Sequence, residues 1–170
     1  MHPMDMKIVQ VLAKESYANA TRRDGSPVYD HAVRMSNVFA RLDTAEMAAV
    51  ALLHDITETT KVTIKDIHDA CVTRPIMDSL MMYHQREDEH WLAYVNRISY
   101  DPVCSAIKIV DMLEDLQCLP TPLEVQQYTY AILVLQGWPI RNLFTDKIMN
   151  VLEIPMEQRI IVAEEENNDE

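Results

Sequence analysis

Two histidines and two aspartates stand in segments where apolar residues recur at helical spacing. They are His31, His54, Asp55 and Asp111. A buried imidazole or carboxylate costs free energy unless it is paired, hydrogen-bonded or bound to a cation. Taken singly, each residue could be a satisfied core histidine or a member of an ion pair, such as Lys108 with Asp111. Taken together, two imidazoles and two carboxylates could close one mixed nitrogen and oxygen metal site between helices.

The elements that must position these residues are predicted to be helices. Apolar residues recur at helical spacing along most of the chain, and no segment alternates convincingly with period two. Asp101-Pro102 and Thr121-Pro122 each have the form of an N-cap followed by proline. The fold class predicted is therefore all-α. The expected helices cover about residues 5–20, 28–41, 44–57, 63–71, 75–84, 88–99, 102–117, 122–136 and 140–152.

The segment 45–53 (AEMAAVALL) is apolar nearly all round and is expected to be a central helix. Glu124 stands three residues after Thr121, where it can close a capping box. The expected organisation is one helical domain over residues 1–152, with motifs within 10–117 and extra helices over 120–152. An acidic, partly disordered tail is expected over 153–170.

The composition excludes several classes of function. The 170 residues include only 2 glycines, 112 positions apart, so neither a dinucleotide-binding GxGxxG nor a P-loop can be written. The net charge of −12 argues against non-specific binding to nucleic acid or to an anionic membrane. No apolar run approaches the roughly 18 residues of a membrane span. The three cysteines, Cys71, Cys104 and Cys118, form no CxxC, which is typical of reduced thiols in a cytoplasmic protein.

In order and spacing, His31, His54-Asp55 and Asp111 resemble the metal ligands of the HD phosphohydrolases. Three segments are similar to the RelA/SpoT-type branch, the hydrolases of guanosine tetra- and pentaphosphate. They are residues 22–31 (RRDGSPVYDH), 52–60 (LLHDITETT) and 107–116 (IKIVDMLEDL). The resemblance covers about residues 10–117 and implies an HD-domain helical bundle there. Residues 120–170 match no family that we can name, and their apolar spacing predicts the additional C-terminal helices.

The resemblance also implies one divalent cation held by all four ligands. We expect Mn²⁺ first, although such a donor set also suits Fe, Co or Zn. Arg22 and Arg23 stand at the family's substrate-binding positions, where guanidinium groups can grip phosphate. A solvated loop pair is an equal alternative for them. Lys108 matches a family lysine and could contact phosphate or balance Asp111.

The catalytic residues expected are Glu58 and Thr59. Glu58, three residues after Asp55, could take a proton from the attacking water. Thr59 stands where the family has a second acidic residue, and its hydroxyl can hydrogen-bond water but cannot take its proton. Asp115 is expected at the substrate, where the family has asparagine, and an aspartate can only accept hydrogen bonds.

We therefore expect a metal-dependent phosphohydrolase that uses activated water on the pyrophosphate of a (p)ppGpp-like nucleotide. Three alternatives stay open. The substrate could be another nucleotide, or the protein could bind a nucleotide or a partner protein with weak or no catalysis. It could also be an interaction domain that uses these polar residues only structurally. The apolar segment at residues 128–136 leaves a homo-oligomer open.

Overall fold

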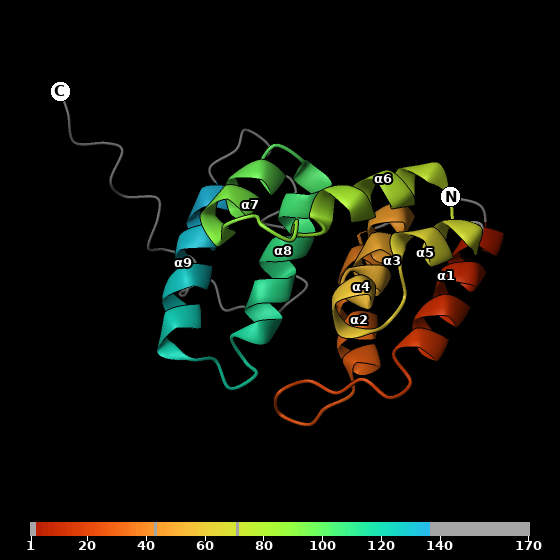
Figure 1. The fold of residues 1–170 in the computed structure, drawn as a ribbon, viewed down its shortest axis with the longest axis horizontal. Helices are drawn as coiled ribbons and strands as arrows, with labels where there is room; N and C mark the ends of the chain where they lie inside the picture. The colour runs from red at the N-terminus through yellow and green to blue at the C-terminus, as the bar shows by residue number, and fades with distance from the viewer. Residues whose placement is uncertain (1–2, 43, 71, 137–170) are drawn as a thin grey trace.

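The computed structural model describes residues 3–42, 44–70 and 72–136, and every regular element among them is a helix (Figure 1). The all-α prediction is confirmed. The helices are α1 (Pro3–Ser16), α2 (Val28–Ala40), α3 (Ala45–Leu53), α4 (Ile56–Thr59), α5 (Ile64–Asp69), α6 (Arg74–Tyr83), α7 (Trp91–Ile98), α8 (Pro102–Asp115) and α9 (Pro122–Gln136). The helix expected over 140–152 and the acidic tail over 153–170 lie outside the described residues. Within the described ranges, no helix combines the length and the apolarity needed to cross a membrane.

Helix α3 lies at the centre of the core, as its sequence predicts. All its residues from Met47 to Leu53 are buried. The helix contacts α1, α2, α6 and α8, so it has neighbours on several sides. A helix that is apolar all round is stable only when other elements exclude water from all its faces. This central position brings the residues that follow Leu53 into the interior.

The chain turns at His54 and Asp55, where the sequence predicts one continuous helix over 44–57. Helix α3 ends at Leu53, and α4 starts after Asp55, whose φ of −95° and ψ of 0° lie outside the helical region. Adjacent side chains on a continuous helix point about 100° apart. The turn removes that constraint, so these two neighbouring side chains can both face one point.

The helices form two groups that meet at α8. Figure 1 shows α1 to α5 gathered on one side and α7 to α9 on the other, with α6 along the upper edge between them. Helix α8 packs on α7 and α9 in its own group and also contacts α2, α3 and α6. Side chains from α2, α3 and α8 therefore meet where the two groups join.

Capping side chains set the starts of α8 and α9. The carboxylate of Asp101 accepts a hydrogen bond from the backbone N–H of Cys104 at 2.8 Å. At α9, the Thr121 N–H donates to Glu124 Oε2 at 2.7 Å, and the Glu124 N–H donates to Thr121 Oγ1 at 3.2 Å. Both helix starts predicted from the sequence are confirmed, and these hydrogen bonds fix where α8 and α9 begin.

Replacing Asp101 by alanine removes the cap of α8 and should lower the free energy of unfolding by about 1 kcal/mol. Urea unfolding followed by circular dichroism measures this loss. Asp101→Asn is the matched control, because its amide oxygen can still accept from Cys104, and it should stay within a few tenths of a kcal/mol of the parent. If both variants lost the same stability, the carboxylate charge rather than the hydrogen bond would stabilise α8.

Candidate metal centre

Four side chains singled out from the sequence meet where the two groups of helices join. His31 comes from α2, His54 and Asp55 from the turn between α3 and α4, and Asp111 from α8. One nitrogen or oxygen atom of each lies within 4.8 Å of the corresponding atoms of the other three. Oδ1 of Asp111 is 3.3 Å from Nε2 of His31 and 3.4 Å from Nε2 of His54. Two nitrogens and two oxygens therefore converge around one point.

The hydrogen bonding of His54 leaves one ring nitrogen facing this point. Its Nδ1 lies 2.7 Å from the carbonyl oxygen of Ala51. Since a carbonyl can only accept, Nδ1 carries the proton, and in the neutral ring Nε2 has a free lone pair. That Nε2 is buried without a hydrogen-bond partner and lies 3.3 Å from Oδ2 of Asp55. A buried, unpartnered lone pair beside two carboxylates fits a divalent cation with nitrogen and oxygen ligands.

The cluster concentrates negative charge that has to be neutralised. Burial lowers the pKa of His54, but Asp55 and Asp111 outweigh that effect and raise the pKa well above its usual range. Burial also lowers the pKa of His31, which Asp111 and Glu114 raise overall. Burial raises the pKa of Asp111, yet neighbouring Lys108 and the two imidazoles hold it well below its usual range. The carboxylates therefore stay ionised and favour protonated imidazoles when no cation is bound. A divalent cation would replace the proton on Nε2 of His54, since metal binding requires the neutral ring.

Outer contacts divide the two oxygens of Asp111 between different partners. Its Oδ2 accepts hydrogen bonds from Lys108 Nζ at 2.7 Å and from the Tyr83 hydroxyl at 3.1 Å, which leaves Oδ1 toward the histidines. The ammonium of Lys108 lies 5.5 to 5.9 Å from the ring centres of Tyr83, Trp91 and Tyr94. Cation–π contacts of this kind hold an ammonium group in place. The structure therefore places Lys108 beside Asp111, and its expected contact with a phosphate group stays a prediction.

The sequence does not predict two residues that contact the cluster, Glu114 and Tyr83. Glu114 Oε2 lies 3.6 Å from Nδ1 of His31 and accepts a hydrogen bond from Arg34 at 2.9 Å. Its spacing of three residues from Asp111 puts it on the same side of α8 and could have signalled this position. Tyr83 comes from α6, far from the other residues in sequence, and no local pattern points to it.

The two expected catalytic residues lie on α4 with different surroundings. Burial and the nearby charge of Asp55 raise the pKa of the Glu58 carboxyl, and its Oε1 lies 3.6 Å from Nδ1 of His84. The hydroxyl of Thr59 donates to the backbone oxygen of Asp55 at 2.8 Å. Thr59 lines a cleft together with Arg22, Arg23 and Asp115, whereas Glu58 is not among the lining residues of that cleft. Of the two, only Glu58 has a group able to accept a proton.

A tight turn between α1 and α2 presents the two arginines. The Arg22 N–H donates to the oxygen of Ser26 at 2.8 Å, and the Gly25 N–H donates to the oxygen of Arg22 at 3.0 Å. Gly25 has φ of +84°, which favours glycine at this position. The carboxylate of Asp24 accepts from both the N–H and the hydroxyl of Ser26. These bonds shape the turn from which both guanidinium groups extend toward α8 and α9.

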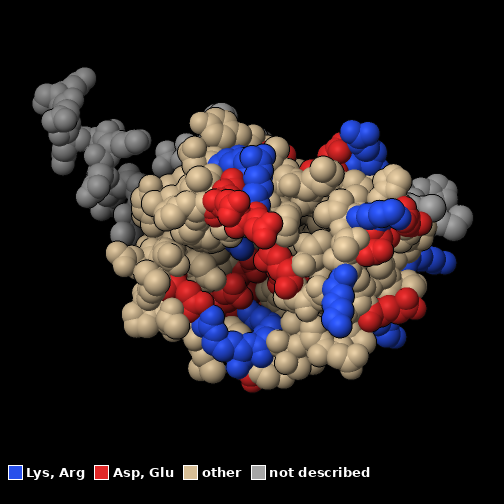
Figure 2. All heavy atoms as spheres, viewed as in Figure 1, with Lys and Arg blue, Asp and Glu red and all other residues tan. Residues whose placement is uncertain are grey.

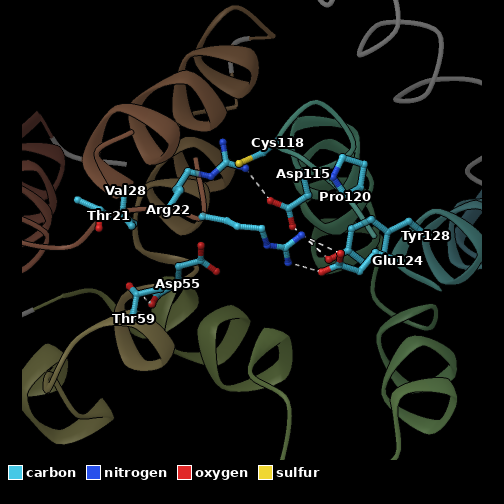
Figure 3. A pocket seen from close by; sticks show the side chains of 11 residues that line it. Thr21, Arg22, Val28, Asp55, Thr59, Asp115, Cys118, Pro120, Glu124 and Tyr128 are labelled. Atoms are coloured by element: carbon cyan, nitrogen blue, oxygen red, sulfur yellow. Dashed lines mark hydrogen bonds and ion pairs between the residues drawn. The ribbon is translucent and has the colours of Figure 1, made fainter. Parts of the chain in front are cut away.

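A cleft of about 200 Å³ lies beside the cluster of His31, His54, Asp55 and Asp111 (Figure 3). Asp55 belongs to both the cluster and the cleft. The lining residues are Thr21, Arg22, Arg23, Val28, Asp55, Thr59, Asp115, Cys118, Pro120, Glu124 and Tyr128. On the face of the molecule seen in Figure 2, acidic side chains surround a central hollow and basic side chains gather below it.

Both arginines are paired with carboxylates across this cleft. Arg22 donates to Asp115 Oδ1 at 2.7 Å, and the second oxygen of Asp115 accepts from the Tyr128 hydroxyl at 3.3 Å. Arg23 donates to both carboxylate oxygens of Glu124, one of them at 2.8 Å. Arg23 and the bonds from Thr121 lower the pKa of the Glu124 carboxyl to about 2. Three of the expected substrate-binding residues thus meet in one cleft, and α9 adds two that sequence reasoning missed.

No protein-family model matches the chain, and no curated protein matches its sequence. The similarity to HD phosphohydrolases is therefore limited to the short motifs around His31, His54-Asp55 and Asp111. The convergence of these side chains is a separate observation, since it follows from the packing of α2, α3 and α8.

Replacing Tyr83 by phenylalanine removes one of the two hydrogen bonds that orient Asp111. The affinity for Mn²⁺, measured by competition with a chelating dye, should fall by roughly tenfold or more, as when outer partners of metal ligands are removed. Tyr94→Phe is the matched control, because it removes a hydroxyl from another buried tyrosine beside Lys108 but leaves both hydrogen bonds of Asp111 in place. Equal affinities in the two variants would contradict a positioning role for Tyr83.

Proposed function

We propose that the protein is a metal-dependent phosphohydrolase that releases pyrophosphate from a (p)ppGpp-like nucleotide. The observation that carries this proposal is the convergence of His31, His54, Asp55 and Asp111, with a buried and unpartnered imidazole nitrogen among them. The adjoining cleft adds support, since it shares Asp55 with the cluster and contains two guanidinium groups. A guanidinium group can bind two oxygens of a phosphate group in the bidentate geometry with which it binds a carboxylate.

The reaction consumes one water molecule and breaks the bond between the pyrophosphate phosphorus and the ester oxygen of the nucleoside. A divalent cation held by the cluster would supply Lewis-acid activation of water and of a phosphoryl oxygen. Glu58 would accept the proton that the attacking water loses, and burial raises the pKa of its carboxyl toward the range in which general bases work. Arg22 and Arg23 would bind the phosphate oxygens and orient the substrate.

Binding of a nucleotide without turnover is the second candidate function, and the contacts of Thr59 favour it. The family pattern has a carboxylate at this position, whereas the Thr59 hydroxyl donates to the backbone oxygen of Asp55. Glu58 would then be the one proton acceptor available on α4. A site with one base in place of two acidic groups can still bind metal and phosphate. The same cluster and cleft would serve such a binding protein.

Hydrolysis is tested by incubating the purified full chain with a panel of nucleotides, including guanosine tetraphosphate, in Mn²⁺ or in EDTA. Ion-exchange chromatography should detect pyrophosphate release that depends on Mn²⁺. Asp55→Ala removes a metal ligand and should lower the rate by more than the roughly 10- to 100-fold lost with an outer partner. Asp78→Ala is the control, because Asp78 forms an exposed ion pair with Arg74 on α6.

Metal analysis of the purified protein and calorimetry decide between the candidates. Near-stoichiometric metal with turnover supports the hydrolase. Metal with tight binding of an intact nucleotide and no product supports the binding protein. If the protein holds no metal, releases no product and shows an unchanged melting temperature with every nucleotide, both candidates are wrong.

A further inference from the structure

The contact between Arg23 and Glu124 closes one end of the cleft. It joins the turn between α1 and α2 to the first turn of α9, segments that lie about a hundred positions apart in sequence. The guanidinium donates through both terminal nitrogens to both oxygens of the carboxylate. These are the donors with which an arginine holds two oxygens of a phosphate group. Glu124 therefore occupies the face of Arg23 that an anionic ligand would use.

Arg23 is also held by a second contact that does not involve Glu124. Its Nη1 donates to the backbone oxygen of Leu119 at 3.0 Å. Leu119 has φ of +49°, in the left-handed region that L-residues rarely adopt. The guanidinium would thus remain anchored at the edge of the cleft if it lost its hydrogen bonds to Glu124.

The neighbouring pair, Arg22 with Asp115, is less suited to exchange. The side chain of Arg22 is 11% exposed, and Asp115 is further held by the Tyr128 hydroxyl. The side chain of Arg23 is 51% exposed, so water screens its pair with Glu124. An exposed pair contributes little net free energy, and a doubly charged phosphate group can displace a singly charged carboxylate from it. Exchange should therefore take place at Arg23.

We infer that Glu124 is an internal competitor that occupies Arg23 in the free protein and is displaced when a phosphate group enters the cleft. This inference rests on the proposed function for its ligand class. Arg23 passes from the carboxylate to the phosphate, and no covalent bond changes. Glu124 keeps its hydrogen bonds to Thr121, so α9 retains its cap while its contact with the α1–α2 turn is released. Ligand binding thereby releases the contact between Glu124 and Arg23, while the bonds of Arg23 to Leu119 and of Arg22 to Asp115 stay in place.

The test is isothermal titration of the full chain with inorganic pyrophosphate, once in EDTA and once in Mn²⁺. Glu124→Gln removes the charge, whereas glutamine can still serve in a capping box, so α9 should keep its start. The variant should bind pyrophosphate roughly two- to fivefold more tightly than the parent, which corresponds to releasing an exposed ion pair. Because both proteins meet the same ligand solution, chelation of Mn²⁺ by pyrophosphate does not affect the ratio of their affinities.

Two further comparisons separate competition from other effects of charge. Asp78→Asn removes one negative charge from the exposed pair on α6 and should leave the affinity unchanged. In an Arg23→Gln background, Glu124→Gln should give no gain, because the contested guanidinium is absent. A gain that persists in that background would mean simple repulsion of the ligand and would overturn the inference.

Weaker binding by Glu124→Gln would mean that the carboxylate positions Arg23 for the ligand, and it would also overturn the inference. So would an absence of pyrophosphate binding in both proteins under both conditions. The EDTA titration involves no hydrolysis, so failure of the proposed hydrolase reaction is distinguishable from failure of the competition. If the protein releases no pyrophosphate but Glu124→Gln still binds pyrophosphate more tightly, the role of Glu124 as internal competitor stands and the proposed hydrolase activity is wrong.

Discussion

The buried carboxylate of Asp111 is the constraint on which the packing around the site depends. It is 3% exposed, and an ionised carboxylate in such a place is costly unless each oxygen has a partner. Its Oδ1 faces His31 and His54, while its Oδ2 accepts from Lys108 and Tyr83. These partners come from α2, the turn after α3, α8 and α6. The contacts that satisfy the Asp111 carboxylate therefore link helices of both groups. These contacts surround a point that can bind a cation.

The local use of charge explains how an acidic chain could bind an anionic ligand. The net charge is −12, and the basic side chains around the cleft are already paired. Lys108 balances Asp111, Arg22 pairs with Asp115, and Arg23 pairs with Glu124. Free positive charge must therefore come from a cation at the cluster or from exchange of an existing pair. Both routes act only at the cleft, which favours a specific ligand over general attraction to polyanions.

Much of the architecture could be predicted because its causes are local in sequence. The caps at Asp101 and Thr121 follow from short-range hydrogen bonds, and the central place of α3 follows from its apolar composition. The turn at Asp55 could not be predicted, since helical spacing continues through it and the turn depends on tertiary contacts. Tyr83 was missed for the same reason. Its hydroxyl reaches Asp111 from 28 positions away, across the packing of α6 on α8.

Glu124 shows why one explanation for a residue does not exhaust its role. Its sequence position accounts for a capping box, and the structure confirms that bond to Thr121. The same carboxylate also accepts hydrogen bonds from both terminal nitrogens of Arg23, because a carboxylate has more acceptor sites than a helix cap uses. The start of α9 and the turn between α1 and α2 thus both bind the carboxylate of Glu124. Since the cap keeps Glu124 in place when Arg23 changes partners, the cleft can exchange an internal anion for an external one without unfolding the helix that forms its wall.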